Sequence, residues 1–331
     1  MAISPVARTR ASIVASIIFT WWVASLLPHF KTATTSSVAP RFPSIKARWG
    51  HDTRYNASKL AIIVDPEPNP LLVPLILHMM AVVPPDWRFL FVGSRESVFS
   101  VGRGFGIQVQ RSLGRIHLKV LPKPWSFEDD QHRSALWTDL RFYHDVMPKV
   151  EWMLKFDRDS ILCSNSETSL NDWLDWSWVG AARYGAFRTL FGAPVATSLT
   201  RKGNRSDDGF SAHGGLSLRR VSVVKRVLEF QKWYNDSAPE DDWFAKRLQP
   251  LPGVKVLSGF HKAFAVENKV VDRPMGYYAP DRGRRLDSEV WSVPETRRKI
   301  FEYCPELRYV MDMKLERERC PEDDKRGKAK A

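Results

Sequence analysis

The sequence is poor in cysteine and lacks the residue spacings that mark several common classes of protein. Its 331 residues include three cysteines, Cys163, Cys304 and Cys320. Three cysteines are too few for a disulfide scaffold or a tetrahedral zinc site, although one bridge and one free thiol would suit an oxidising lumen. No zinc-finger spacing or RNA-binding signature occurs, and the basic residues are scattered, with the densest cluster in the terminal KRGKAK. These absences argue against a nucleic-acid-binding protein.

A dinucleotide-binding fingerprint is missing as well. Gly102, Gly104 and Gly106 form a glycine-rich stretch between two predicted strands. The fingerprint requires glycines at fixed positions between a strand and a helix. Neither its third position nor a following helical pattern is present, so we expect a flexible turn here.

Positive charge exceeds negative charge, and apolar residues are plentiful. The chain has 50 Lys and Arg against 37 Asp and Glu, a net charge of +13. Such an excess favours nucleotide phosphates, other polyanions or an anionic membrane surface as partners. Hydrophobic residues make up 44% of the chain, which is enough for a sizeable core in one large or two small domains. We expect a folded body of the size of an enzyme.

One apolar segment near the N-terminus carries no Asp, Glu, Lys or Arg. It spans residues 11–30 and follows Arg8 and Arg10. About 20 mainly apolar residues can cross a bilayer, and the preceding arginines place residues 1–10 in the cytosol and the remainder in a lumen. The sequence predicts a transmembrane signal-anchor with type II topology. A cleaved signal peptide, with small residues Ala24 and Ser25 before the cleavage site, is the alternative; the length of the segment favours the anchor.

The two segments that flank the expected folded body lack the periodicity of packed elements. Residues 31–58 are rich in Thr, Ser, Pro and basic residues, as in a stem. Residues 314–331 are charged and predicted to be disordered. Glycosylation triplets begin at Asn56, Asn204 and Asn235, all in the part assigned to the lumen. We therefore expect a single-pass membrane protein of the Golgi or another secretory compartment.

Residues 59–313 alternate between strand and helix patterns. We expect strands at 59–65, 88–94, 115–122, 150–156, 176–182 and 213–220, with short strands at 254–258 and 263–267. We expect helices at 71–83, 127–147, 166–176, 221–233 and 239–248. Alternating strands and helices predict an α/β domain with a mixed, mainly parallel central sheet flanked by helices.

The stretch around which the domain is organised is VEWMLKFDRDSILC, residues 150–163. Its apolar run suits a buried central strand, and ligands of open α/β sheets gather beyond the carboxyl ends of strands. Asp157 and Asp159 would lie there, where two carboxylates can hold one Mg²⁺ or Mn²⁺ ion and a diphosphate. The structural alternatives are that these acids cap the following turn, or that Asp157 pairs with Arg158 or Lys155.

The second half of the domain adds further candidates. His213 precedes Gly214 and Gly215, a glycine pair that allows close approach of the backbone to a ligand. Three consecutive acids, Glu240, Asp241 and Asp242, begin a predicted helix, where plain capping is an equal alternative. Two arginines, Arg183 and Arg219, either hold phosphate or form exposed salt bridges. The tryptophans at 173, 176 and 178 mainly suit core packing.

Six fragments in order resemble a family of uncharacterised glycosyltransferase-like domains common in fungi. They cover most of the chain from Lys59 to about Val310 and read KLAIIVDPEPNPLLVPLILHMMAVVPPDWRFLFVGS, KFDRDSILCSNSETSLNDWLDWSWVGAA, GGLSLRR, PEDDWF, FAVE and CPE. The resemblance implies a single GT-A-like domain, with the nucleotide-sugar donor bound by the first half of the sheet and the acceptor by the second half.

The resemblance also implies roles for particular residues. Asp65 would approach the nucleotide, and Asp157 and Asp159 would bind metal or donor, with Asp159 the safer contact. His213, Gly214 and Gly215 would border the sugar and acceptor. One of Asp241 and Asp242, or less directly Glu240, would remove the proton from the acceptor hydroxyl. A late histidine commonly completes the metal site; His261 is available, but the stretch PMGYYAP, where that histidine would be sought, carries Tyr277 and Tyr278 instead.

These expectations combine into a type II membrane glycosyltransferase that moves a sugar from a nucleotide-sugar donor to a luminal glycan or glycoconjugate, with Mn²⁺ or Mg²⁺ assisting. The departure at the late histidine puts full metal dependence in doubt. It also leaves an alternative function, a catalytically inactive GT-A-fold protein that binds glycans at the membrane.

Overall fold

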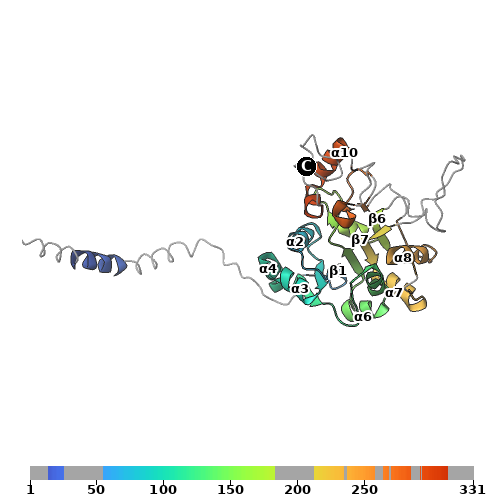
Figure 1. The fold of residues 1–331 in the computed structure, drawn as a ribbon, viewed down its shortest axis with the longest axis horizontal. Coiled ribbons are helices and arrows are strands. Elements are labelled where there is room, and N and C mark those ends of the chain that lie inside the picture. Colours follow the sequence, from blue (N-terminus) through green and yellow to red (C-terminus); the bar gives the residue numbers. More distant parts are fainter. Residues whose placement is uncertain are drawn as a thin grey trace, which may run out of the picture. The chain divides into compact units, whose positions relative to one another are not determined.

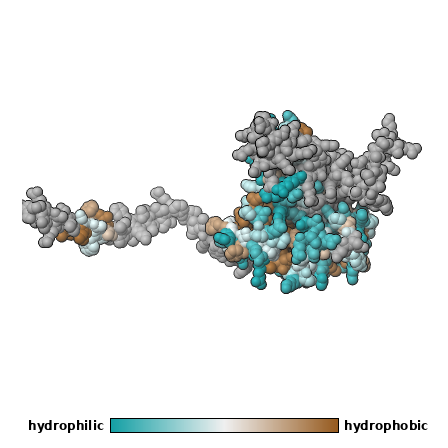
Figure 2. Space-filling model, viewed as in Figure 1, coloured by the Kyte–Doolittle hydropathy of each residue, from teal (hydrophilic) through white to brown (hydrophobic). Residues whose placement is uncertain are grey.

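The computed structural model describes residues 14–25, 55–182, 212–234, 237–257, 264–267, 270–284, 291 and 293–311. The chain divides into two compact units, residues 1–52 and 53–331. In the first unit, residues 14–25 form a helix whose side chains are all exposed, and its hydrophobic residues are seen in Figure 2. Within the described residues, no helix has both the length and the apolar character needed to cross a membrane. The predicted anchor, residues 11–30, extends past the described helix at both ends, and most of the predicted stem and all of the predicted tail lie outside the described residues.

The second unit is built on a nine-stranded sheet flanked by helices (Figure 1). Its strands are β1 (Lys59–Val64), β2 (Arg88–Gly93), β3 (Ile116–Val120), β4 (Trp152–Phe156), β5 (Ser160–Leu162), β6 (Trp178–Ala182), β7 (Ala212–Arg220), β8 (Ala265–Val266) and β9 (Gly276–Tyr278). Its α-helices are α2 (Leu72–Val82), α3 (Arg95–Gly102), α4 (Phe105–Ser112), α5 (Asp130–Trp137), α6 (Leu140–Val146), α7 (Val221–Phe230), α8 (Glu240–Leu248) and α10 (Pro294–Tyr303). Short 3-10 helices are η2 (Leu170–Trp173), η4 (Pro280–Gly283) and η5 (Pro305–Tyr309).

The sheet is mixed, as the sequence predicts. Its order is β3-β2-β1-β4-β7-β6-β8-β9-β5. The strands β3, β2, β1 and β4 run parallel, and β7 pairs antiparallel with both β4 and β6. The strand β5 follows β4 directly in sequence but pairs with β9 at the far end of the order. The sheet therefore curls, and the three-residue turn between β4 and β5 holds Asp157, Arg158 and Asp159.

Each face of the sheet is covered by its own hydrophobic cluster. Along β1, Ala61 and Ile63 point to one cluster while Ile62 and Val64 point to the other, as the two-residue period of a strand requires. The helices α2, α3, α4 and α10 contribute to the first cluster, and α5, α6, α7 and α8 contribute to the second. Both faces are apolar, which explains why the central strands read as continuous hydrophobic runs.

Three predicted elements differ in the structure. The helix expected at 127–147 is two helices, because Asp139 caps α6 by accepting the N–H of Arg141 and also accepts the indole N–H of Trp125. The helix expected at 166–176 is only the 3-10 turn η2, begun by a capping box between Ser169 and Asp172. The strand expected at 254–258 is reduced to one bridge, between Val256 and Trp178.

The glycine-rich stretch is a packing device rather than a flexible turn. Gly104 precedes α4 and Gly106 lies in its first turn. A Cβ atom on Gly104 would lie 2.8 Å from a methyl carbon of Val73, and one on Gly106 would lie 2.7 Å from a methyl carbon of Leu77. Both contacts are with α2. The glycines therefore let α4 approach α2 closely, which the spacing alone did not reveal.

A disulfide ties the C-terminal helices to the sheet. Cys163, next to the end of β5, bonds to Cys304, at the end of α10, across 141 residues of sequence. Both cysteines are fully buried, and Glu306 in η5 accepts hydrogen bonds from the backbone and hydroxyl of Ser164. The third cysteine, Cys320, lies outside the described residues. The bridge that the sequence allowed is thus present.

Removing this disulfide should lower stability without changing the sheet. The paired substitutions Cys163→Ser and Cys304→Ser release a long loop in the unfolded chain, for which the expected loss is about 2 to 5 kcal/mol. Thermal unfolding followed by circular dichroism should show a fall in Tm with an unchanged folded spectrum. The control is Cys320→Ser. A Tm equal to that of the unmodified chain under oxidising conditions would show that the bridge contributes nothing.

Candidate active site

The candidate site lies where β1 and β4 end. These two strands are parallel neighbours, so the residues that follow them, Asp65 and Asp157, emerge at the same edge of the sheet. The Asp65 N–H donates to the carbonyl of Val92 at 2.9 Å, and the Asp157 N–H donates to the carbonyl of Gly215 at 2.8 Å. Backbone hydrogen bonds from both neighbouring strands thus fix these positions. The structure brings together the two acids that the sequence placed at separate strand ends.

Arg158 turns back toward the end of β1. Its guanidinium donates to the Asp65 carboxylate at 2.7 Å and to the Glu67 carboxylate at 2.6 Å. Asp65 is 2% exposed, and its other oxygen, Oδ2, has no hydrogen-bond partner among the described residues. Burial raises the pKa of Asp65 to about 6 despite the attraction of Arg158. Arg158 therefore serves Asp65 and Glu67, rather than the neighbouring Asp157 as one structural alternative had it.

Asp159 faces a turn of unusual backbone geometry, which is formed by Asp281, Arg282 and Gly283 in η4. Its carbonyl accepts the N–H of Ala279, and backbone N–H groups of Asp281 and Arg282 face its carboxylate. Asp281 and Arg282 have φ angles of 53° and 56°, and Gly283 has 84°. Left-handed backbone costs non-glycine residues roughly 1 to 2 kcal/mol each. Here it points successive N–H groups at one anionic side chain.

The carboxylate of Asp159 is not fully satisfied by this turn. Its Oδ1 atom is buried and meets no hydrogen-bond partner in the part of the chain that the structure describes. Burial, followed by repulsion from Asp157, raises the pKa of Asp159 to about 6. A narrow crevice runs past it, lined also by Asn69 before α2, by Arg158 and Arg282, and by Tyr309 of η5. Asp157 and Asp159 thus form a group of negative charge in which one buried oxygen, Oδ1 of Asp159, has no partner among the described residues.

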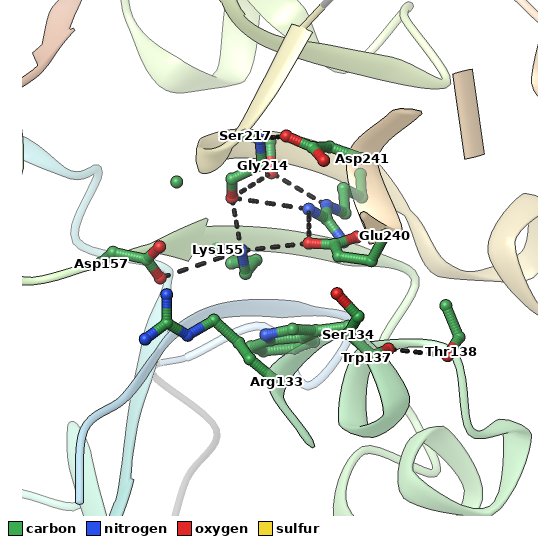
Figure 3. Close-up of polar contacts among 12 residues, drawn as sticks. Arg133, Ser134, Trp137, Thr138, Lys155, Asp157, Gly214, Ser217, Glu240 and Asp241 are labelled. Atoms are coloured by element: carbon green, nitrogen blue, oxygen red, sulfur yellow. Dashed lines mark hydrogen bonds and ion pairs between the residues drawn. The ribbon is translucent and has the colours of Figure 1, made fainter. Parts of the chain in front are cut away.

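A buried cluster of charges lies directly behind Asp157 (Figure 3). Lys155, which lies in β4, is 3% exposed. Its ammonium donates to the Gly214 carbonyl at 2.6 Å and lies 3.2 Å from Oε1 of Glu240 and 3.8 Å from Oδ1 of Asp157. The ring of Trp137 lies 5.2 Å from the same ammonium. Strand β4 therefore carries a buried cation two residues before the partly exposed Asp157.

Arg219 of β7 completes the cluster. It is fully buried and binds Glu240 through two hydrogen bonds of 2.9 and 3.0 Å. Its guanidinium stacks 4.0 Å from the ring of Trp178. Although burial alone would raise the pKa of Glu240, the charges of Arg219 and Lys155 hold it well below its usual range. Arg219 is neither an exposed salt bridge nor a free phosphate contact, the two alternatives from the sequence, and Glu240 has no oxygen available for general-base work.

The other two acids at the start of α8 differ from Glu240. Asp241 accepts the N–H of Gly214 at 3.1 Å and that of Asp242 at 3.1 Å. It is 9% exposed, whereas Asp242 is half-buried. The structure therefore brings Asp241 to the backbone of β7 beside the buried cluster, so that α8 reaches the same region as β4.

The glycine pair in β7 makes room for the protein's own side chains. A Cβ on Gly214 would lie 2.7 Å from Oε1 of Glu240, and one on Gly215 would lie 2.3 Å from the ring of Tyr278. The pairing of β7 with β6 shifts register at this point, as at the bulges that often border active sites. The close approach expected for a ligand is thus an approach to Glu240 and Tyr278. His213 lies in β7, but its side chain lies outside what the structure describes.

Two residues at this edge were missed or misjudged from the sequence. Arg133 on α5 points its guanidinium toward the Asp157 carboxylate (Figure 3), and it pairs with the exposed Asp130 at 3.0 Å. Nothing in the helical pattern distinguishes Arg133 from other surface arginines. Tyr278, noted only as the absence of a histidine, has its pKa raised by burial and by the charges of Asp157 and Asp159. Tyrosine is therefore an uncharged neighbour of these acids.

Among the described residues, no three His, Cys, Asp or Glu side chains lie close enough together to hold a metal ion between them. His261 and Arg183 lie outside the described residues, so their predicted roles stay predictions. Asp157 and Asp159 remain as at most two carboxylate ligands. Mg²⁺ is commonly held by one or two carboxylates together with water and substrate phosphates, so two ligands fit such a site.

Comparison with known proteins gives one family and several remote structures. A family model described as "Protein of unknown function (DUF5672)" matches residues 115–278, and no curated protein matches the chain. The mannosyltransferase PcManGT from Pyrobaculum calidifontis, in complex with GDP-Man and Mn²⁺, aligns with 84% of this chain and 68% of its own at 13% identity and a TM-score of 0.41. The bifunctional glycosyltransferase WbbM aligns with 67% of this chain and 46% of its own, at 10% identity and a TM-score of 0.41. The mannosyltransferase Ktr4p from S. cerevisiae in complex with GDP aligns with 46% of this chain and 50% of its own, at 11% identity and a TM-score of 0.29. The alignments span half or less of the WbbM and Ktr4p chains.

The raised pKa of Asp159 predicts a pH-dependent gain in stability for Asp159→Asn. The pKa rises from 3.8 to about 6 on folding. Well below pH 3.8 the carboxyl is neutral in both states, and folding carries no penalty. Between pH 4 and 6 the unfolded chain ionises first, so the native state is progressively disfavoured, by about 2 to 3 kcal/mol above pH 6. Denaturant unfolding should therefore find Asp159→Asn more stable than the unmodified protein at pH 7.5 and similar to it at pH 4. An equal difference at both pH values would contradict this origin.

Proposed function

We propose that this chain is a membrane-anchored glycosyltransferase with a GT-A-like fold, which transfers a sugar from a nucleotide-sugar donor to a luminal glycan or glycoconjugate. The observation that carries the proposal is the grouping of Asp65, Asp157 and Asp159 at one edge of the sheet, with Asp241 reaching the adjacent backbone of β7. Parallel strands deliver the first group, and α8 delivers Asp241. The order of sequence fragments that resemble glycosyltransferase-like domains supports the same function.

The carboxylate group fits a divalent cation and a diphosphate. Two buried oxygens, Oδ2 of Asp65 and Oδ1 of Asp159, have no hydrogen-bond partner among the described residues. Burial, with a smaller contribution from the charge of Asp157, raises the pKa of both acids. Buried negative charge is costly unless a cation neutralises it. Asp157 and Asp159 would hold Mn²⁺ or Mg²⁺, which supplies neutralisation of the charge on the leaving diphosphate. Carboxylate oxygens suit these ions.

Within the described residues, Arg133 is a cation that can contact the donor at this edge. Lys155 and Arg219 are committed to Glu240, and Arg158 is committed to Asp65 and Glu67. Arg133 pairs with the exposed Asp130 and lies over the ring of Phe127, and its guanidinium points toward the Asp157 edge (Figure 3). A guanidinium can bind a phosphate through two parallel hydrogen bonds. We assign to Arg133 a contact with the diphosphate of the donor.

Asp241 is the proposed general base. Two backbone N–H groups, those of Gly214 and Asp242, orient its carboxylate at the start of α8. In the proposed reaction the acceptor hydroxyl gives its proton to Asp241, and the acceptor oxygen forms a bond to the anomeric carbon. The bond between that carbon and the diphosphate breaks, and the nucleoside diphosphate leaves with the electron pair. Glu240 and Arg219 take no part in the proton transfer because each engages the other.

The compartment and the topology are part of the proposal. The apolar N-terminal segment and the arginines before it predict an anchor with the folded unit in a lumen. The buried disulfide between Cys163 and Cys304 supports an oxidising compartment, because such bridges are rare in the cytosol. We place the protein in the Golgi or another secretory compartment on these grounds.

Donor binding can be measured on residues 55–331 without knowing the acceptor. A panel of UDP- and GDP-sugars with Mn²⁺ should contain a donor that raises the Tm, because a ligand of the native state stabilises it. Arg133→Ala should weaken the Kd for that donor by roughly 10- to 100-fold, the loss expected for a charge-assisted hydrogen bond. Exposed Arg111→Ala on α4 is the control. If no donor raises the Tm, the transferase proposal fails; if a glycan alone raises it, the inactive glycan-binding alternative is favoured.

The general base can be separated from its neighbour by paired substitutions. Asp241→Asn should lower kcat for transfer by about 10² to 10⁴, the range expected when a positioned base is lost, while the Kd for the donor changes little. Asp242→Asn should lower kcat far less. Both variants should be checked for unchanged Tm. A larger loss of kcat in Asp242→Asn would move the role to that residue, and an unchanged kcat in both would exclude a base at the start of α8.

A further inference from the structure

The buried ammonium of Lys155 joins three parts of the site that are far apart in sequence. It contacts the Gly214 carbonyl in β7, the Glu240 carboxylate in α8 and the Asp157 carboxylate after β4, at 2.6, 3.2 and 3.8 Å. The close-up view shows it between Asp157 on one side and Glu240 on the other (Figure 3). The first two contacts lie within hydrogen-bond distance, and the third is an ion pair.

The charges in the cluster indicate that Lys155 is not present for Glu240 alone. Glu240 already receives two hydrogen bonds from Arg219, the arrangement that satisfies a carboxylate most fully. A second buried cation beside an already paired acid would be costly without another partner. Asp157 is that partner, since it is the other carboxylate within ion-pair distance of the ammonium. Two cations thus face two acids.

We propose that Lys155 is a positioning residue that fixes the Asp157 carboxylate relative to the start of α8, and so sets the separation between the donor side and the acceptor side of the site. This inference rests on the proposed function and deepens it. Asp157 has a side chain that is 22% exposed, so the ammonium can hold it from behind while its outer face stays accessible. The same ammonium forms an ion pair with Glu240, the residue that directly precedes Asp241 in α8.

A fixed ammonium behind Asp157 has a second consequence. A divalent cation bound to the outer face of Asp157 would be repelled by the positive charge of Lys155, since like charges a few ångströms apart interact strongly in a partly buried site. Lys155 therefore weakens cation binding while it holds the geometry. A residue with a merely structural role would not show this opposition, because loosened packing weakens binding and turnover together.

The test compares Lys155→Met with Lys155→Arg, measured on the folded unit with Mn²⁺ and a donor found in the panel. Lys155→Met removes the charge but keeps most of the length. We expect it to bind Mn²⁺ alone about 10-fold more tightly, by titration calorimetry in the absence of donor. We expect its kcat to fall by about 100-fold, as displaced reacting groups cause. Lys155→Arg should keep the Mn²⁺ affinity near that of the unmodified protein.

The matched control is Lys59→Met. Lys59 is a largely buried lysine that begins β1 and pairs with Asp86 at 2.7 Å, at the opposite end of the strand from Asp65. We expect it to lower the Tm but to leave Mn²⁺ affinity and kcat unchanged. If Lys155→Met does not fold, Lys155→Gln, which can still donate to the Gly214 carbonyl, takes its place with the same expectation.

The outcomes separate this inference from the proposed function. Weaker or unchanged Mn²⁺ binding by the neutral variants, in a protein that binds Mn²⁺ and donor normally when unmodified, would overturn the role of Lys155 alone. An unmodified protein that binds neither Mn²⁺ nor any nucleotide sugar would overturn the proposed function and this inference together. Tighter Mn²⁺ binding with slower transfer would support both.

Discussion

The antiparallel pairing of β7 with β4 is the contact on which the site depends. Through it the carbonyls of Gly214 and Gly215 receive the Lys155 ammonium and the Asp157 N–H. The same strand carries Arg219, and Arg219 holds α8 through Glu240. One strand therefore positions acids from β4 and from α8, elements that the chain forms more than eighty residues apart. The first half of the domain cannot complete the site without it.

The buried charges make this arrangement specific rather than simply stable. Lys155, Arg219 and Glu240 are all nearly inaccessible, and a well-packed apolar cluster of similar volume would often be as stable or more so. Charges need partners in defined directions, whereas apolar groups accept many arrangements. The aromatic rings of Trp137 and Trp178 face the two cations and exclude water from them. The cluster thus fixes the angle at which α8 meets the sheet.

The sequence predicts the strands well because a buried strand appears as a run of apolar residues that are consecutive in the chain. The apolar runs before Asp65 and Asp157 identify β1 and β4, and their parallel pairing brings those acids to one edge as expected. The charge cluster could not be predicted in the same way. Its pairs join residues distant in sequence, such as Arg158 and Asp65 at a separation of 93, and no local pattern states which arginine meets which acid. Asp139, which divides the helix predicted at 127–147, shows that a single capping side chain can override a helical stripe.

Two hollows on the folded unit differ in whether the polar groups beside them have partners. A cavity of about 220 Å³ lies beside Phe230 and Arg247. There Arg247 stacks on Trp243 and donates to its carbonyl and to Gln231, so two of its three nitrogens have partners within the chain. At the edge near Asp159 the hollow is narrower, yet it holds a buried oxygen lacking a partner among the described residues, left-handed backbone at Asp281 and Arg282, and a raised pKa. Each of these features destabilises the folded chain, and strain of this kind gathers at functional sites. Among the described residues, an unsatisfied buried oxygen and left-handed backbone, rather than the volume of an opening, therefore favour the ends of β1 and β4 as the candidate site.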